Sequence, residues 1–119
     1  MRVLVIDDDQ DIREMLSLAL ELRWPEVTVS IAETGEEGIA DFESEEPDLV
    51  ILDIGLPGID GFEVLSSIRK VSRVPVIMLT ARGDDASISK AESLGANEYV
   101  TKPFSVSDLL VRARALVTR

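Results

Sequence analysis

Short, uninterrupted apolar runs alternate along this chain with segments of helical periodicity, and this alternation restricts the possible folds more than any other feature. The runs are rich in β-branched residues and occupy residues 3–6, 49–52 and 76–79, with a weaker one at residues 99–100. A run without polar alternation is typical of a strand buried on both faces of a parallel sheet. Residues 27–31 alternate apolar and polar side chains instead, which predicts a half-exposed strand at the sheet edge.

The segments between these strands have the marks of helices. Two apolar stripes follow helical spacing, namely Ile12, Met15, Leu16, Ala19 and Leu20, and later Val106, Leu109, Leu110, Ala113, Leu116 and Val117. Thr34, Asp60 and Ser105 each stand three residues before a carboxylate, which predicts helix N-caps, and Gly95 predicts a C-cap. Strand and helix therefore alternate five times, which predicts an α/β fold with a parallel sheet, right-handed crossovers and helices on both faces.

Composition narrows the function classes. The chain has 119 residues, which favours one compact domain. It contains no cysteine and no histidine, so disulfides, zinc fingers, catalytic thiols and histidine acid–base chemistry are excluded. A net charge of −11 opposes binding to nucleic acid. No apolar run approaches the roughly 20 residues that span a bilayer, and Met1 leads directly into a strand without a signal peptide, so we expect a cytoplasmic protein.

Polar side chains follow the apolar runs at the points where the predicted strands end. Asp7, Asp8 and Asp9 follow the first strand, Asp53 the third and Thr80 the fourth, and Lys102 comes after the fifth. In a parallel sheet these carboxyl ends meet at one edge, which is where open α/β sheets bind ligands. We therefore expect these side chains to form one site although they are far apart in sequence.

The residue types predict the chemistry of that site. Carboxylates gathered together repel one another unless a cation lies among them. Oxygen ligands without cysteine or histidine favour a hard cation, Mg2+ or Mn2+, over zinc. Lys102 would add a fixed positive charge and Thr80 a hydroxyl donor, which are parts that hold a phosphoryl group opposite a metal. Because no serine–histidine or cysteine–histidine pair is possible, a carboxylate is the natural nucleophile, and the product would be an aspartyl phosphate.

Each of these residues also has an ordinary structural explanation. The acids at residues 7–9 could cap a helix, and Asp53 could initiate the turn that follows it. Thr80 could cap the next segment, and Lys102 could be a solvated charge. These explanations would all have to hold at once, each beside the end of a strand, so the functional interpretation is favoured.

Four strings in the chain resemble the motifs of the receiver domains of two-component response regulators: VIDDD (5–9), LDIGLPGIDG (52–61), MLTARGDD (78–85) and GANEYVTKPF (95–104). The resemblance covers essentially the whole chain and implies a single receiver domain over residues 1–119. It implies a flavodoxin-like, doubly wound (βα)5 fold, with five parallel strands in the order 2-1-3-4-5 and helices on both faces.

Carried over residue by residue, the resemblance makes Asp53 the phosphoacceptor. It implies that Asp8 binds Mg2+ (or Mn2+) directly and that Asp7 binds it largely through water. Gly55 falls where the family offers a backbone carbonyl to the metal, and Asp53 completes the ligands. Asp9 has no part in the family's site and is expected to be the N-cap of the first helix.

The resemblance also implies a switch. Thr80 matches the hydroxyl that moves toward the phosphoryl oxygens, with the backbone N–H of Ala81 beside it. Lys102 matches the lysine of the family motif, and its bond to Pro103 is expected to be cis. Tyr99 matches the aromatic that turns inward when Thr80 moves, although an ordinary edge-strand aromatic would look the same in sequence. The surface formed by the fourth helix, fifth strand and fifth helix would then change.

The implied partners follow from the same resemblance. The phosphoryl donor would be the phosphohistidine of a sensor histidine kinase, and the domain would be a signalling switch rather than an enzyme, although it assists its own phosphorylation and dephosphorylation. The string MLTARGDD resembles receivers that continue into a winged-helix DNA-binding domain, so control of transcription is expected. Such receivers form weak, phosphorylation-dependent homodimers. Here Ile88 replaces a usual basic residue and Asn97 a usual acid, which weakens that expectation.

Three other functions use related sequence features. A haloacid-dehalogenase-type phosphatase needs a second aspartate two residues after its nucleophile, where this chain has Gly55, and usually carries a cap domain. A flavin-binding flavodoxin needs a Ser/Thr/Gly phosphate loop after the first strand, where this chain has consecutive aspartates. A docking module that is never phosphorylated would not need Asp8, Asp53, Thr80 and Lys102 together.

Overall fold

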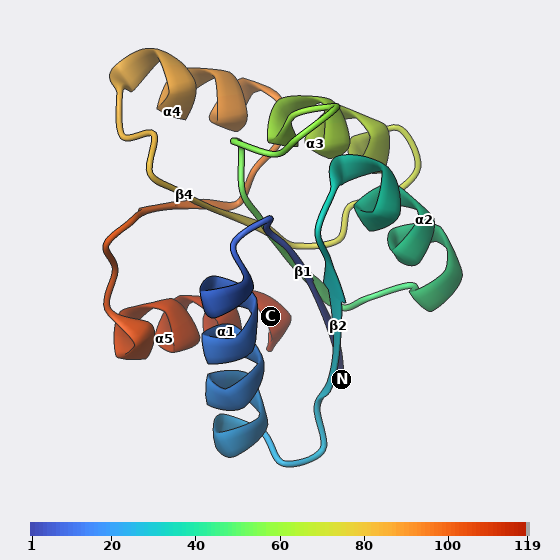
Figure 1. Cartoon of the computed structure of the whole chain (residues 1–119), viewed down its shortest axis with the longest axis vertical. Helices are drawn as coiled ribbons and strands as arrows, with labels where there is room; N and C mark the ends of the chain where they lie inside the picture. The colour runs from blue at the N-terminus through green and yellow to red at the C-terminus, as the bar shows by residue number, and fades with distance from the viewer. Residues whose placement is uncertain (119) are drawn as a thin grey trace.

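The computed structural model describes residues 1–118 and contains a parallel sheet of five strands in the order β2-β1-β3-β4-β5 (Figure 1). The strands are β1 (Arg2–Ile6), β2 (Thr28–Ala32), β3 (Leu49–Leu52), β4 (Val76–Thr80) and β5 (Glu98–Thr101). The helices are α1 (Gln10–Arg23), α2 (Gly35–Glu45), α3 (Gly61–Arg69), α4 (Asp85–Ser93) and α5 (Val106–Val117). The predicted flavodoxin-like fold and strand order are confirmed. Residue 119, the end of the predicted domain, lies outside the described residues.

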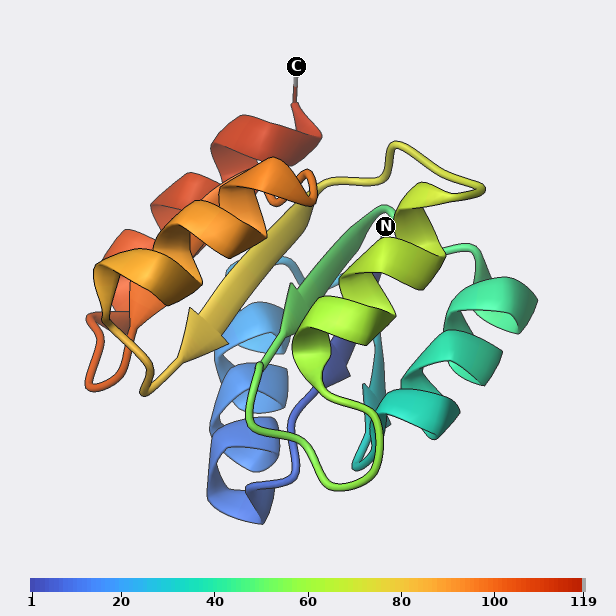
Figure 2. The same cartoon turned by 90° about the horizontal axis from the view of Figure 1, so that it is seen from above.

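Helices cover both faces of the sheet, so the strands are buried on both sides. Helices α1 and α5 lie on one face, and α2, α3 and α4 lie on the other, as Figures 1 and 2 show. Successive side chains of a strand point to opposite faces. In β1, Val3 and Val5 accordingly pack with α1 and α5, whereas Leu4 and Ile6 pack in the second core with α2 and α3. This double burial explains why the central strands are apolar without alternation.

The edge strand β2 and the helix caps agree with the sequence pattern in most details. β2 begins one residue later than predicted, and its residue Ile31 remains 50% exposed. The side chains of Asp9, Thr34 and Asp60 each accept a hydrogen bond from a backbone N–H in the first turn of the following helix. No helix among the described residues is long and apolar enough to cross a membrane.

The register of the strands brings their carboxyl ends to one level. Ile6 of β1 pairs with Leu52 of β3, and the backbone N–H of Asp53 donates to the carbonyl of Ile6 at 3.0 Å. Between β4 and β5, the N–H of Lys102 donates to the carbonyl of Thr80 at 2.8 Å. The residues that follow β1, β3 and β5 are therefore held along the same sheet edge by backbone hydrogen bonds.

Candidate functional site

Three carboxylates meet at the carboxyl edge of the sheet. Asp7 and Asp8 follow β1, Asp53 follows β3, and one oxygen from each lies within 4.8 Å of the others. Asp7 and Asp53 are buried, at 2% and 8% exposure, whereas Asp8 is exposed to solvent. The cluster therefore has two acids in the floor of the site and one at its mouth.

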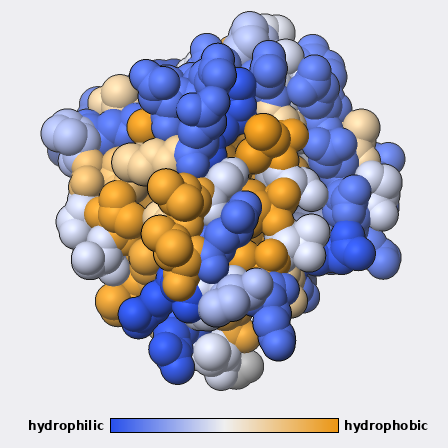
Figure 3. All heavy atoms as spheres, turned by 60° about the horizontal axis from the view of Figure 1, so that its bottom comes forward, coloured by the Kyte–Doolittle hydropathy of each residue, from blue (hydrophilic) through white to orange (hydrophobic). Residues whose placement is uncertain are grey.

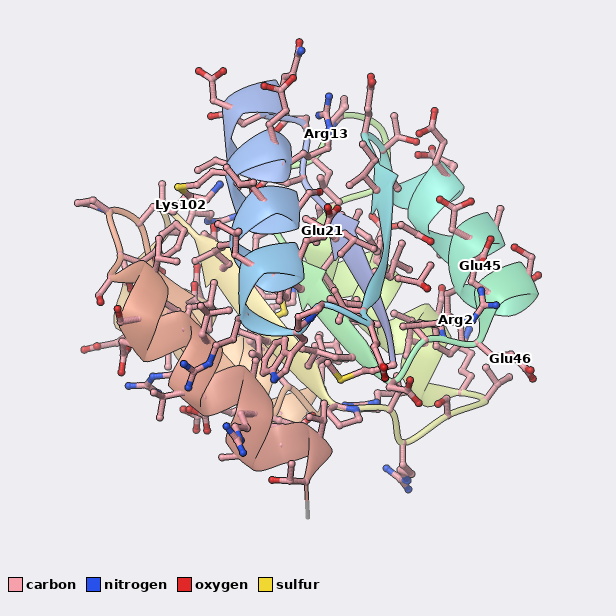
Figure 4. The ribbon with its side chains drawn as sticks, turned by 90° about the horizontal axis from the view of Figure 1, so that it is seen from below. Arg2, Arg13, Glu21, Glu45, Glu46 and Lys102 are labelled. Atoms are coloured by element: carbon pink, nitrogen blue, oxygen red, sulfur yellow. The ribbon has the colours of Figure 1, made fainter. Side chains whose placement is uncertain are left out.

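Lys102 supplies the positive charge beside this cluster. Its Nζ lies 2.8 Å from Oδ2 of Asp7 and 3.4 Å from Oδ2 of Asp53. The peptide bond between Lys102 and Pro103 is cis, as expected. Burial alone lowers the pKa of Lys102, but its hydrogen bond to Asp7 and the charge of Asp53 raise that pKa above its ordinary value. Lys102 is therefore a fixed cation, and Figure 4 labels it in the view from below.

Asp7 is held at every polar position. Its N–H donates to the carbonyl of Ala32 at 3.1 Å, and its Oδ1 accepts from the N–H of Asp9 at 2.9 Å. Its Oδ2 accepts from Lys102, and its carbonyl accepts from Nη1 of Arg13 at 2.9 Å. Burial raises the pKa of the Asp7 carboxyl above its ordinary value, and the bonds from Lys102 and Asp9 offset this only in part. Removing water from a carboxylate disfavours its charged form, so a cation in the site would be favourable.

The predicted switch residues lie on the side of the site toward α4. The Thr80 side chain is buried, and its Oγ1 accepts a hydrogen bond from the N–H of Arg82 at 3.3 Å. The Tyr99 hydroxyl donates to the carbonyl of the same Arg82, and the Tyr99 ring is half-buried. Ala81, between Thr80 and Arg82, is exposed. One peptide segment after β4 thus contacts both side chains.

Gly55 lies beside Asp53 at the mouth of the site. Its N–H donates to Oδ1 of Asp53 at 3.3 Å. A Cβ added at Gly55 would meet no heavy atom within 4 Å, so the space beside Gly55 is open. The possible metal ligands are the carboxylate oxygens of the three aspartates. A set of oxygen ligands fits Mg2+ or Mn2+.

Arg13 is a site residue that the sequence pattern did not identify. It lies in α1, is 6% exposed, and donates to the carbonyl of Asp7. The apolar stripe predicted for α1 counted only apolar side chains, but Arg13 shares the buried face with Leu16 and Leu20. These three residues have the spacing i, i+3 and i+7, and this spacing in the sequence could have indicated that Arg13 faces the sheet.

A hollow in the surface lies away from the carboxylates. Its volume is about 840 Å³, and Met1, Trp24, Pro75 and Val117 are among the residues that line it. Figure 3 brings the lower end of the molecule forward and shows apolar side chains gathered on this face. None of the charged groups described above lines this hollow, so its size does not bear on the chemistry at Asp53.

Comparisons with known proteins identify relatives of this chain. Residues 3–114 match the family model described as the response regulator receiver domain. The "Probable transcriptional regulator ycf27" of Guillardia theta is 46% identical over 118 residues, which are 99% of this chain and 46% of that protein. The "Transcriptional regulatory protein AfsQ1" of Streptomyces coelicolor is 42% identical over 117 residues, or 98% of this chain and 51% of that protein. The chain spans about half the length of these relatives.

Solved structures are similar over the same range. The crystal structure of a two-component response regulator from Clostridium difficile has a TM-score of 0.95 and 30% identity, covering 100% of this chain and 97% of that one. A receiver domain protein (CheY-like) from Methanospirillum hungatei has a TM-score of 0.91 and 30% identity, covering 98% of this chain and 93% of that one. Sequence motifs, fold, site geometry and these matches lead to one conclusion: the chain belongs to the response regulator receiver domain family.

Proposed function

We propose that this chain is a phosphorylation switch that accepts a phosphoryl group on Asp53 with the help of Mg2+. The observation that carries the proposal is the cluster of Asp7, Asp8 and Asp53, with carboxylate oxygens within 4.8 Å of one another and Lys102 bonded to two of them. This grouping combines a nucleophile, acidic ligands and a fixed cation at the place where open α/β sheets bind ligands. The phosphoryl donor is the phosphohistidine of a sensor histidine kinase.

The proposed reaction is a transfer between two side chains. An oxygen of Asp53 attacks phosphorus, and the bond from phosphorus to the donor's imidazole nitrogen breaks. That nitrogen keeps the bonding electrons, and the leaving imidazole takes up a proton. Lys102 lies 3.4 Å from the Asp53 oxygen, where it can pair with charge on the arriving group. Phosphoryl transfer depends mainly on such positioning and electrostatic stabilisation.

The metal ligands of the proposal are all oxygen atoms. Asp8, Asp53 and the backbone carbonyl of Gly55 would hold Mg2+, and Asp7 would bind it largely through water. Mn2+ has the same ligand preference. The ion, when bound, supplies positive charge that offsets both the carboxylates and the phosphoryl oxygens. Asp8 is the exposed acid of the cluster, so an ion that arrives from solvent meets it first.

The proposed switch runs through the peptide segment after β4. Phosphorylation adds about two negative charges and three strong acceptor oxygens at Asp53. The Thr80 hydroxyl turns toward these oxygens, as does the N–H of Ala81, and the bond from the N–H of Arg82 to Thr80 is lost. Tyr99, which is bonded to the carbonyl of Arg82, then moves inward. The surface of α4, β5 and α5 changes as one population shift between two packed states.

The output belongs to the whole protein of which a receiver is one part. Relatives about twice the length of this chain are named as transcriptional regulators, and this supports a C-terminal DNA-binding output domain and control of transcription. The receiver unit of the proposal comprises residues 1–119 and does not bind DNA, in keeping with a net charge of −11. It acts as a signalling domain rather than as an enzyme.

The test is phosphorylation by a small-molecule donor. Phosphoramidate with Mg2+ is expected to add one phosphoryl group to the wild-type chain, seen by intact-mass spectrometry. Asp53→Asn, or EDTA in place of Mg2+, should abolish the added mass. Asp41→Asn, in α2, is the matched control and should be modified like wild type. Modification that persists in Asp53→Asn, or that ignores EDTA, would overturn the proposal.

A further inference from the structure

Arg13 is a buried cation behind the acidic cluster. Its side chain is 8% exposed, and its Nε is buried without a hydrogen-bond partner among the described residues. Arginine is rarely buried to this extent unless it is paired. A leucine at this position would pack with Leu16 and Leu20 without the cost of removing a charge from water. The presence of Arg13 on this face therefore calls for a function beyond packing.

The strongest contact of Arg13 is with the backbone of the site. Its Nη1 donates to the carbonyl of Asp7 at 2.9 Å, in buried surroundings. Its Nη2 lies 3.4 Å from Oε1 of Glu33, whose side chain is 67% exposed, so this ion pair contributes little. Figure 4 shows Arg13 between α1 and β2, where it can reach both the loop after β1 and the residue after β2.

The carbonyl that Arg13 holds belongs to the peptide joining Asp7 to Asp8. Asp7 itself has other restraints, because its N–H, Oδ1 and Oδ2 are all bonded. Asp8 differs: within residues 1–118, no hydrogen bond restrains its side chain. The direction in which Asp8 leaves the backbone is therefore set by the peptide that Arg13 fixes.

We propose that Arg13 is a positioning residue of the metal site, which orients the Asp7–Asp8 peptide and thereby sets the affinity of the acidic cluster for Mg2+. This inference rests on the proposed function, because it assumes that the cluster binds Mg2+. Arg13 acts through the backbone and does not touch the ion or the phosphoryl group. Partners that orient metal ligands typically change metal affinity by 10–100-fold when they are removed.

Calorimetric titration with Mg2+ tests the inference on the whole chain. Arg13→Met is expected to bind Mg2+ roughly tenfold more weakly than wild type. Arg13→Lys keeps a charge and N–H donors but not the planar guanidinium, so its affinity should lie between the two. Arg23→Met, in the last turn of the same helix, is the matched control and should bind like wild type. Saturating Mg2+ should restore the phosphoramidate reaction rate of Arg13→Met, because the loss is one of affinity.

The outcomes separate the two proposals. If wild type and Asp8→Ala both fail to bind Mg2+, the proposed function is wrong. If wild type binds and Arg13→Met binds equally well while its melting temperature falls, Arg13 has only a structural role and the inference is overturned. If Arg13→Met does not fold, Arg13→Lys decides, because wild-type affinity in that variant overturns the inference and weaker affinity supports it.

Discussion

Arg82 connects the two proposed switch residues through its backbone, and its side chain has a separate contact. The guanidinium carbon lies 5.7 Å from the centre of the Phe62 ring, in a cation–π arrangement over α3. Because the space beside Gly55 is open, we expect water to approach a phosphoryl group on Asp53 from there. Arg82 is exposed and lies two residues after Thr80, and we expect its side chain to pair with the phosphoryl charge.

We therefore expect Arg82→Ala to accelerate loss of the phosphoryl group. An exposed ion pair contributes at most about 1 kcal/mol, so the decay rate should rise by up to roughly fivefold. Decay of the phosphorylated protein followed by intact mass measures it. Arg114→Ala, in α5, should decay like wild type. Equal decay rates in the two variants would remove Arg82 from the mechanism.

Helix α4 is attached to the sheet less firmly than its neighbours. Only Ser87 and Ala91 are buried within it. Its C-terminal end is held by Arg69 of α3, whose Nε donates to the carbonyl of Gly95 at 3.0 Å. Nη2 of Arg69 also donates at 3.0 Å to Oδ1 of Asn97, which accepts from Val76 N–H as well. Movement of α4 should therefore be larger at its N-terminal end.

Replacing Arg69 with Met should loosen the C-terminal end of α4. Loss of hydrogen bonds from a charged group costs about 1.5–3 kcal/mol, so the free energy of unfolding in urea should fall by that order. Hydrogen exchange should accelerate at the amides of Gly95 and Ala96, whose N–H groups close the end of α4. Lys70→Met, at the next and exposed position, should change neither measurement. An unchanged hydrogen-exchange rate at Gly95 and Ala96 in Arg69→Met would show that Arg69 does not hold the C-terminal end of α4.

At the scale of the whole molecule, the α4–β5–α5 surface already pairs its charges within one chain. Arg112 of α5 is bonded to Glu98 of β5, and its Nε lies 3.0 Å from Oδ2 of Asp108. Asn97, which stands where the family usually has an acid, directs its Oδ1 to Arg69. Ile88 is half-buried beside this surface rather than fully exposed. Dimerisation through this face must therefore exchange internal ion pairs for pairs between chains.

We expect a monomer without phosphate and a weak, two-fold dimer with beryllofluoride and Mg2+. Exposed ion pairs contribute at most about 1 kcal/mol each, so losing two customary pairs lowers dimer affinity by roughly tenfold or more. Sedimentation velocity at high protein concentration measures both states. Arg112→Glu should abolish the dimer, and Arg23→Glu, at the far end of α1, should not. A monomer in both states would make this face a docking site for other partners.

The sequence predicted the fold and the gathering of the acids because both follow from topology. Once apolar runs and helices alternate, a parallel sheet places the residues after β1 and β3 at one edge, so Asp7 and Asp53 had to lie close together. The burial of Arg13 was not predicted, because a count of apolar positions overlooks a charged side chain whose partner is a backbone carbonyl. The contact of Arg82 with Phe62 could not be predicted either, since it depends on how α3 and the loop after β4 pack.

The hydrogen bond between Lys102 and Asp7 joins residues 95 positions apart, so its two partners are synthesised at different times. A ribosome adds about 5–20 residues per second, so roughly 5–20 s separate the synthesis of the two partners. During that interval the nascent chain has its first acids but lacks its lysine. Because β5 is the last strand to emerge, an unfinished chain cannot assemble the complete site. The complete grouping of Asp7, Asp53 and Lys102 therefore forms only after the final fifth of the chain has been synthesised.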